Sequence, residues 1–344
     1  MARCTARPRP SSAPSESQEA ERRLSDAAAD HPTHPLGAFA GPLVLGNASL
    51  EFEPRPISEQ YRSVPYRPDT VADGWSTERF TVRAASVRGL LHRHNGAPRQ
   101  DDFAVAYSRS PERLIIAVAD GVSSAPQSHL GATVAVRFAL QQMATRVEGG
   151  VASVDWLELM RHCAWQLVEQ AHALFPDAGV GTPSPARAES LMATTLVCAL
   201  LDFPEDAPGA TVQIAGVGDS GAWILDRGTF DRVFGGKSDG DSSITSSAVS
   251  GLPQVPTEMT PTVVTLPPGS TLLLGTDGFG DPLGNGGGIV GQAFAGGLAS
   301  PPAMLEFAHL LDFSRETFDD DRTLVGVWVS EPGPDGGNES EAPA

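Results

Sequence analysis

Cysteine and lysine are both scarce in this chain, and each shortage excludes a class of protein. The three cysteines, Cys4, Cys163 and Cys198, lie far apart, and none forms a Cys-x-x-Cys pair. We therefore expect neither a disulfide framework nor a zinc ribbon, and this usage fits a reducing cytoplasm. Lys237 is the only lysine, and 24 basic residues face 42 acidic ones, for a formal net charge of −18. Such a chain repels phosphates, so we expect no binding to nucleic acid or to an anionic membrane.

Long apolar runs are missing as well. No run reaches the roughly 18–20 residues that a membrane-spanning helix needs. The N-terminus begins with basic residues but continues PRPSSAPSESQEAERR, without the apolar stretch of a secretory signal. The sequence therefore predicts a soluble, cytoplasmic protein.

Composition predicts one folded domain between two tails. Residues 1–75 are rich in Pro, Ser, Ala and charge, and we expect a flexible leader there because such residues bury too little surface to offset their ordering entropy. Residues 331–344, EPGPDGGNESEAPA, predict an acidic, disordered tail. Residues 76–330 lie between them and are long enough for a single domain with a sizeable core.

Within residues 76–330, the apolar pattern predicts strands, then two helices, then strands again. Strands are expected at 80–85, 102–107, 113–119, 194–203, 211–216, 222–226, 229–234, 262–266, 271–274 and 323–329. Two helices are expected with Ser128 and Ser153 as their N-caps, and a further helix is expected at 302–313. Residues 235–256 predict a long surface loop, and a glycine-rich loop follows the strand at 271–274. This grouping favours an α+β fold, a two-sheet β-sandwich flanked by helices, over alternating βαβ units.

Aspartates fall where these strands begin or end. Asp120 ends the apolar strand LIIAVAD and Asp277 ends TLLLGTD, and each is followed by glycine. Further aspartates precede strands or occupy a turn: Asp101, Asp102, Asp219, Asp319, Asp320 and Asp321. Buried carboxylates need compensation, and several at one end of a sheet suit a hard divalent cation. The alternative is structural, because Asp-Gly is also a common turn dipeptide.

Six motifs stand in a characteristic order, and together they carry a family resemblance. They are ASVRGLLHRHNGAPRQDDFAV, LIIAVADGVSSAPQSHLGA, ATTLV, GVGDSGAW, LLLGTDGFGDPL and DDDRTLVGVWV. The chain resembles the metal-dependent protein phosphatase (PPM, type 2C) family over about residues 80–330. It is most similar to the bacterial subgroup, in which a Gln-Asp pair such as Gln100-Asp101 replaces Glu-Asp.

The resemblance implies two Mg²⁺ or Mn²⁺ ions and a third, weaker one. The metal ligands that it implies are Asp101, Asp120, the carbonyl of Gly121, Asp219, Asp277 and Asp320. Asp120 would bridge two ions, and Asp219 would hold the third. With Asp120 and Asp277 as catalytic residues, a metal-activated water would hydrolyse phosphoserine or phosphothreonine without a phosphoenzyme. The implied partners are phosphorylated proteins, with a serine/threonine kinase and its targets among them, and residues 235–256 would be the family's substrate-selecting flap.

The phosphate-binding group departs from the family pattern. The family's arginine usually lies five residues before the aspartate of the pair, where this chain has Gly96. Candidates to replace it are Arg88, Arg93 and Arg99, and His92 as a donor to the phosphate or the leaving group. Val122 occupies the position at which eukaryotic members place a histidine general acid.

Four other readings stay open at this stage. The rival from a different class is a pseudophosphatase, which would keep the fold as a binding or regulatory module. Gly218–Gly221, with the order Gly-Asp-Ser-Gly, echoes the nucleophile motif of chymotrypsin-like proteases but lacks a suitably placed His. Residues 286–291 satisfy GxGxxG without directly following a strand. His92 and His94 could pair on a metal, although no third nitrogen or sulfur ligand is near in sequence.

Overall fold

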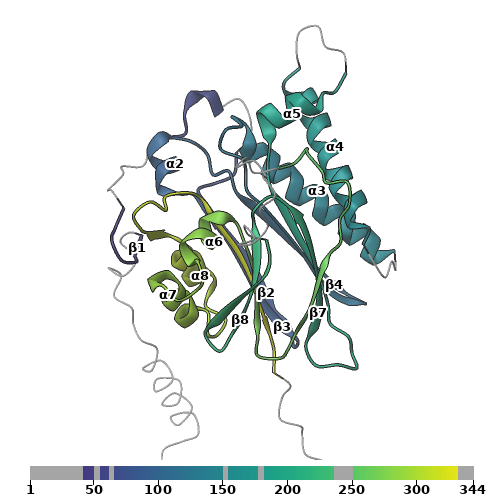
Figure 1. The fold of residues 1–344 in the computed structure, drawn as a ribbon, viewed down its shortest axis with the longest axis vertical. Helices are drawn as coiled ribbons and strands as arrows, with labels where there is room; N and C mark the ends of the chain where they lie inside the picture. Colours follow the sequence, from purple (N-terminus) through teal and green to yellow (C-terminus); the bar gives the residue numbers. More distant parts are fainter. Residues whose placement is uncertain are drawn as a thin grey trace, which may run out of the picture. The chain divides into compact units, whose positions relative to one another are not determined.

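The computed structural model describes residues 42–49, 55–61, 66–149, 154–176, 182–235 and 251–331. In these residues the main feature is a pair of antiparallel sheets (Figure 1). The five-stranded sheet has the order β10 (Thr262–Leu266), β7 (Ala210–Val217), β6 (Leu196–Asp202), β5 (Glu112–Ala119) and β4 (Asp102–Arg109). The six-stranded sheet has the order β2 (Thr70–Ser76), β3 (Phe80–Val87), β13 (Arg322–Val329), β11 (Thr271–Gly275), β8 (Gly221–Asp226) and β9 (Thr229–Phe234). The predicted α+β, two-sheet sandwich is confirmed.

Strand β5 contributes side chains to two separate apolar clusters, one on each face of its sheet. Its residues alternate between faces, as the pleat of a strand requires. Leu114 and Ile116 join the apolar cluster between the two sheets, whereas Ile115 and Ala117 join the cluster under the helices. The run RLIIAVA is therefore continuous in sequence because both faces of the strand are buried.

Helices cover the outer face of each sheet (Figure 1). The five-stranded sheet carries α3 (Ser128–Glu148), α4 (Trp156–Leu174) and α5 (Pro185–Met192). The six-stranded sheet carries α6 (Asp277–Leu283), α7 (Ile289–Gly297) and α8 (Met304–Leu311). The first two predicted helices are present, but the predicted N-caps are wrong. Ser128 is the first residue of α3, with Gln127 at the N-cap position. Asp155 caps α4, because its side chain accepts a hydrogen bond from Glu158 N at 2.9 Å.

The flexible leader predicted for residues 1–75 is wrong for those residues of this range that the structure describes. β2 pairs with β3 along its length, so the domain begins before residue 76. The polar sequence of β2, TVADGWS, did not predict a strand, because β2 is an edge strand with half-exposed side chains. Further upstream, β1 (Leu43–Val44) pairs in parallel with β12 (Phe313–Ser314), and Leu45 is buried. Residues 1–41 lie outside the described residues, as do residues 332–344 of the predicted tail.

The glycine-rich loop predicted after residue 274 is also wrong. It holds α6 and α7, whose glycines and proline disfavour helix in isolation. Packing compensates, since Phe279 and Phe294 are fully buried and meet edge-to-face at 5.1 Å between ring centroids. Two short helices were not predicted either: α2 (Leu90–Asn95) and the one-turn η2 (Glu59–Tyr61).

The long loop predicted at residues 235–256 is described only at its ends. Residues 236–250 lie outside the described residues. At the C-terminal end, Leu252 is fully buried and forms a backbone bridge with Thr194. Across the described parts of the chain, no helix combines the length and the apolar character needed to cross a bilayer.

Candidate active site

In the five-stranded sheet, strand register brings two of the predicted aspartates together. β4 and β5 pair antiparallel with Asp102 opposite Ala119. Asp101, just before β4, and Asp120, just after β5, therefore lie at the same end of the sheet. Asp101 is only 2% exposed, so its carboxylate is held away from water.

The six-stranded sheet repeats this arrangement. β11 and β13 pair antiparallel with Gly275 opposite Leu324. Asp277, which starts α6 just after β11, and Asp320, just before β13, are thus placed at one end of that sheet. A bond between the sheets then joins the two pairs, because Thr276 Oγ1 donates to Asp101 Oδ2 at 2.8 Å.

The backbone of Asp120 is fixed by the start of β6. Its carbonyl accepts hydrogen bonds from Thr195 N at 2.7 Å and Thr194 Oγ1 at 2.8 Å, and its N–H donates to Thr195 Oγ1 at 2.9 Å. Thr195 Oγ1 also lies 2.9 Å from Ser220 Oγ. Through Thr195, the loop that carries Asp219 is tied to Asp120.

Close approach of the backbone requires glycine after both key aspartates. A Cβ on Gly121 would lie 2.8 Å from Ser128 Cβ and 2.9 Å from the Gln100 carbonyl oxygen. A Cβ on Gly278 would lie 1.8 Å from the carbonyl oxygen of Asp321. These Asp-Gly pairs are therefore positions of tight packing and not only turns.

The clustered carboxylates resist ionisation. Burial, together with the charges of Asp101 and Asp277, raises the pKa of Asp120 well above its usual range, and Asp120 and Asp277 share a side-chain hydrogen bond. Burial and the neighbouring aspartates likewise raise the pKa of Asp101. The pKa of Asp277 is raised by burial first and then by Asp219 and Asp320, to about 6. Such repulsion is relieved by a cation, and carboxylate and carbonyl oxygens are the ligands that Mg²⁺ and Mn²⁺ prefer.

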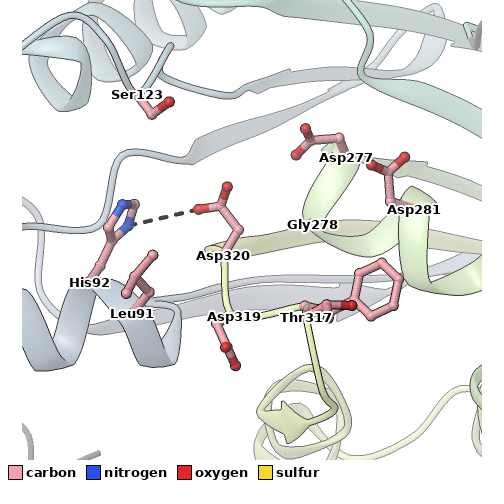
Figure 2. Close-up of a pocket in the computed structure, with 10 residues that line it drawn as sticks. Leu91, His92, Ser123, Asp277, Gly278, Asp281, Thr317, Asp319 and Asp320 are labelled. Carbon is pink, nitrogen blue, oxygen red and sulfur yellow. Dashed lines mark ion pairs between the residues drawn. The ribbon is translucent and has the colours of Figure 1, made fainter. Parts of the chain in front are cut away.

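A cavity of about 400 Å³ opens beside these aspartates (Figure 2). Its lining residues are Leu91, His92, Ser123, Asp277, Gly278, Asp281, Thr317, Phe318, Asp319 and Asp320. Among the described residues that line it, His92 is the only basic one. The predicted His92 therefore lies in the same cavity as Asp277 and Asp320.

His92 is held by Asp321, a residue to which the sequence analysis gave no role. His92 Nδ1 lies 2.9 Å from Asp321 Oδ1 and 3.9 Å from Asp320 Oδ1. Burial lowers the pKa of His92, but the charge and hydrogen bond of Asp321 outweigh it and raise the pKa to about 9. The pKa of Asp321 is lowered, because His92 and two backbone N–H groups outweigh the effect of its own burial.

The structure does not bring the predicted Arg93 to the cavity. Its guanidinium forms 2.9 Å ion pairs with Asp69 and Asp312. Arg88 donates to the His92 carbonyl at 2.9 Å, and the buried Arg99 donates to the Pro68 carbonyl at 3.2 Å. None of the three arginines lines the cavity, because each is engaged in holding neighbouring backbone or acids.

The weaker sequence motifs do not form sites among the described residues. Ser220 of the Gly-Asp-Ser-Gly motif is 2% exposed and bonds Thr195 in place of a histidine. The GxGxxG motif, residues 286–291, follows helix α6 and not a strand. His92 and His94 lie on a helix, α2, where residues two apart face different sides. His94 does not line the cavity.

A model of the protein phosphatase 2C family matches residues 88–305, which is more than half of the chain. The chain therefore belongs to the protein phosphatase 2C family, in agreement with the order of its six motifs. A search of curated protein sequences finds no significant match.

Solved structures resemble the chain at low sequence identity. RsbX, solved in complex with magnesium, is 13% identical with a TM-score of 0.49, over 76% of this chain and 100% of that one. The catalytic domain of the serine/threonine phosphatase PstP, solved with 2 manganese ions, is 19% identical with a TM-score of 0.47, over 74% and 99%. The phosphatase MsPP from Mycobacterium smegmatis, solved with cacodylate, is 16% identical with a TM-score of 0.45, over 74% and 100%. The family assignment rests on the family match and not on these similarities.

Proposed function

We propose that this chain is an active, metal-dependent protein serine/threonine phosphatase. One observation carries the proposal. Four aspartates from the two sheets lie close together beside a cavity, and no basic side chain among the described residues that line the cavity neutralises all four. They are Asp101, Asp120, Asp277 and Asp320. A pseudophosphatase has no need to keep such mutually repelling acids together, because their repulsion destabilises the fold.

The donor set fits Mg²⁺ or Mn²⁺. Asp101, Asp120, Asp277 and Asp320 would hold the two ions through their carboxylate oxygens. The Gly121 carbonyl would add an oxygen ligand, and Asp219 would hold a third ion. When bound, the two ions would lower the pKa of a water molecule and neutralise charge on the phosphate oxygens.

The protein's own contribution at the cavity is to orient the phosphate. His92, whose pKa is raised to about 9 by Asp321, lines the cavity together with Asp277 and Asp320 (Figure 2). A phosphoserine or phosphothreonine could place one phosphate oxygen against His92 while the others meet the metals. Phosphorylated proteins are therefore the proposed substrates, with an opposing serine/threonine kinase as a proposed partner. The cytoplasmic location stays a prediction.

Hydrolysis of a phosphothreonine peptide tests this function. We expect turnover with Mn²⁺, loss of turnover in EDTA, and loss in Asp277→Ala. Asp206→Ala serves as the matched control, because Asp206 is exposed in the turn before β7 and does not line the cavity. Absence of turnover in a folded protein that binds Mn²⁺ would contradict an active phosphatase and support the pseudophosphatase. Turnover that EDTA leaves unchanged would contradict the metal mechanism.

A further inference from the structure

The cavity beside the aspartates has an apolar part that the proposed chemistry does not use. Among the described residues that line it, Leu91 and Phe318 are the two large apolar ones. Leu91 lies in the first turn of α2, next to His92, and is 45% exposed (Figure 2). An apolar group that packed against these two side chains would be stabilised there, because apolar surface on both sides would leave water.

Phe318 belongs to the segment that leads into β13. The guanidinium carbon of Arg315 lies over its ring, 5.8 Å from the ring centroid. The backbone of Phe318 is fixed twice, since its N–H donates to the Arg315 carbonyl at 3.0 Å and its carbonyl accepts a hydrogen bond from Arg322. The half-buried ring is thus held in one position at the cavity wall.

The residue before Phe318 has a strained backbone. Thr317 lines the cavity and has a φ of 71°, in the left-handed region that a β-branched residue rarely adopts. The chain just before it is fixed as well, because Glu316 N donates to the Asn47 carbonyl at 3.0 Å. Backbone strain persists where the surrounding structure enforces it, and such positions cluster at active and ligand-binding sites. The strained turn therefore indicates a functional role for the wall that carries Phe318.

The elements that carry Leu91 and Phe318 meet at Asp319. Leu91 N donates to the Asp319 carbonyl at 3.1 Å. The side chain of Asp319 points away from that of Asp320 (Figure 2), and its Oδ2 accepts from Ser49 Oγ at 2.8 Å. The acid next to the two apolar side chains is thus paired within the protein, which favours an apolar over a basic neighbour for them.

We infer that Leu91 and Phe318 are specificity-determining residues, which bind an apolar side chain next to the phosphorylated serine or threonine of the substrate. The inference rests on the proposed phosphatase function and adds a substrate class to it, namely phosphorylation sites with an apolar neighbour. Both residues share one cavity with Asp277 and Asp320, so a phosphate held there would bring the next residue of its peptide within their reach.

Matched phosphothreonine peptides test the specificity. They differ only in the residues directly before and after the phosphothreonine, which are Leu, Gly or Lys. Wild-type kcat/KM should be about tenfold higher for the Leu peptide than for the Gly peptide, as for an apolar side chain that is buried in part. Leu91→Ser and Phe318→Ser should each reduce this ratio to about threefold or less. Leu305→Ser, at an exposed leucine of α8 that does not line the cavity, should leave the ratio unchanged. Equal rates for Leu and Gly, a higher rate for Lys, or a ratio that either cavity variant keeps would overturn the inference.

A binding assay separates failure of this inference from failure of the proposed function. The same peptides are made with a non-hydrolysable phosphonate in place of the phosphate, and fluorescence anisotropy measures their affinity in Mn²⁺. The Leu peptide should bind about tenfold more tightly than the Gly peptide, and Leu91→Ser should reduce that difference. This result without hydrolysis of the phosphorylated peptides would support the inference and contradict an active phosphatase. Equal affinities, or no binding of either peptide, would overturn the inference, and hydrolysis would then still support the proposed function.

Discussion

Two kinds of aspartate lie side by side at this site, and their pKa values are shifted in opposite directions. Asp101, Asp120 and Asp277 are crowded together, and burial and repulsion raise the pKa of each. Asp321 is as buried as Asp101, yet His92 and two backbone N–H groups lower its pKa. The direction of the pKa shift therefore separates acids that are neutralised within the fold from acids that need a cation. An acid neutralised within the protein is structural, and a group of acids left unneutralised is a binding site for a cation from outside.

Removal of a repelling acid should give the largest effect. Asp120→Ala or Asp277→Ala should reduce turnover of a phosphopeptide by about a thousandfold or more, because each variant loses a carboxylate that would hold the metals. In EDTA the same variants should melt no lower than the wild type, since they also lose repulsion. Turnover within tenfold of wild type in either variant would remove the metal mechanism.

Asp219 should give an intermediate effect. It lies in the turn between β7 and β8, next to Ser220, and its charge raises the pKa of Asp277. Asp219→Ala should raise the Mn²⁺ concentration needed for half-maximal activity, by roughly tenfold if it removes one carboxylate ligand of a weak site. Kinetic titration with Mn²⁺ measures this, and an unchanged midpoint would refute a third site at Asp219.

The pH dependence of stability should differ between the two kinds of acid. The pKa of Asp277 is raised from 3.8 to about 6, so the folded state binds more protons than the unfolded state between these values. In EDTA, Asp277 should therefore destabilise the fold progressively as pH rises from about 4 to about 6, by roughly 1–2 kcal/mol after allowance for solvent screening. Denaturant unfolding of the wild type and of Asp277→Asn at several pH values isolates this contribution. The free energy of unfolding of the wild type should fall relative to that of Asp277→Asn over this range, and a difference that stays constant would contradict the raised pKa of Asp277.

The smallest effect is expected at the paired side chains away from the cavity. Arg93→Ala breaks ion pairs with Asp69 and Asp312, which are 45% and 27% exposed. Exposed pairs contribute little, so we expect a loss of about 1 kcal/mol in the free energy of unfolding and no change in KM. A raised KM in this variant would place Arg93 in phosphate binding after all.

Much of this site could be predicted from the sequence, because its signal is local. Asp120 and Asp277 each end an apolar strand and precede glycine, and antiparallel pairing then brings strand ends together. The role of Asp321 could not be predicted in this way. Its partners, Gly89 and Gln100, lie more than 200 residues away in sequence, and only the folded register of β13 against β3 brings them near.

In the fold, too, some elements can be predicted from the local sequence and others cannot. Strand β5 is predictable because its whole length is apolar, whereas edge strand β2 is half-exposed and polar. Helices α6 and α7 run against local propensity, since glycine and proline disfavour helices. They form because Phe279 and Phe294 pack against the six-stranded sheet, and the sequence alone carries no signal for that tertiary contact.

Calorimetric titration of Mn²⁺ into the metal-free protein at about pH 6 tests whether the clustered aspartates bind cations. If the unneutralised aspartates hold the cations, binding should occur and should release protons, because carboxyl groups with raised pKa values must ionise to become ligands. The released protons are measured by repeating the titration in buffers of different ionisation enthalpy. Asp120→Asn should weaken binding strongly, and Asp206→Asn should not. Binding without proton release, or binding that survives Asp120→Asn unchanged, would contradict the account.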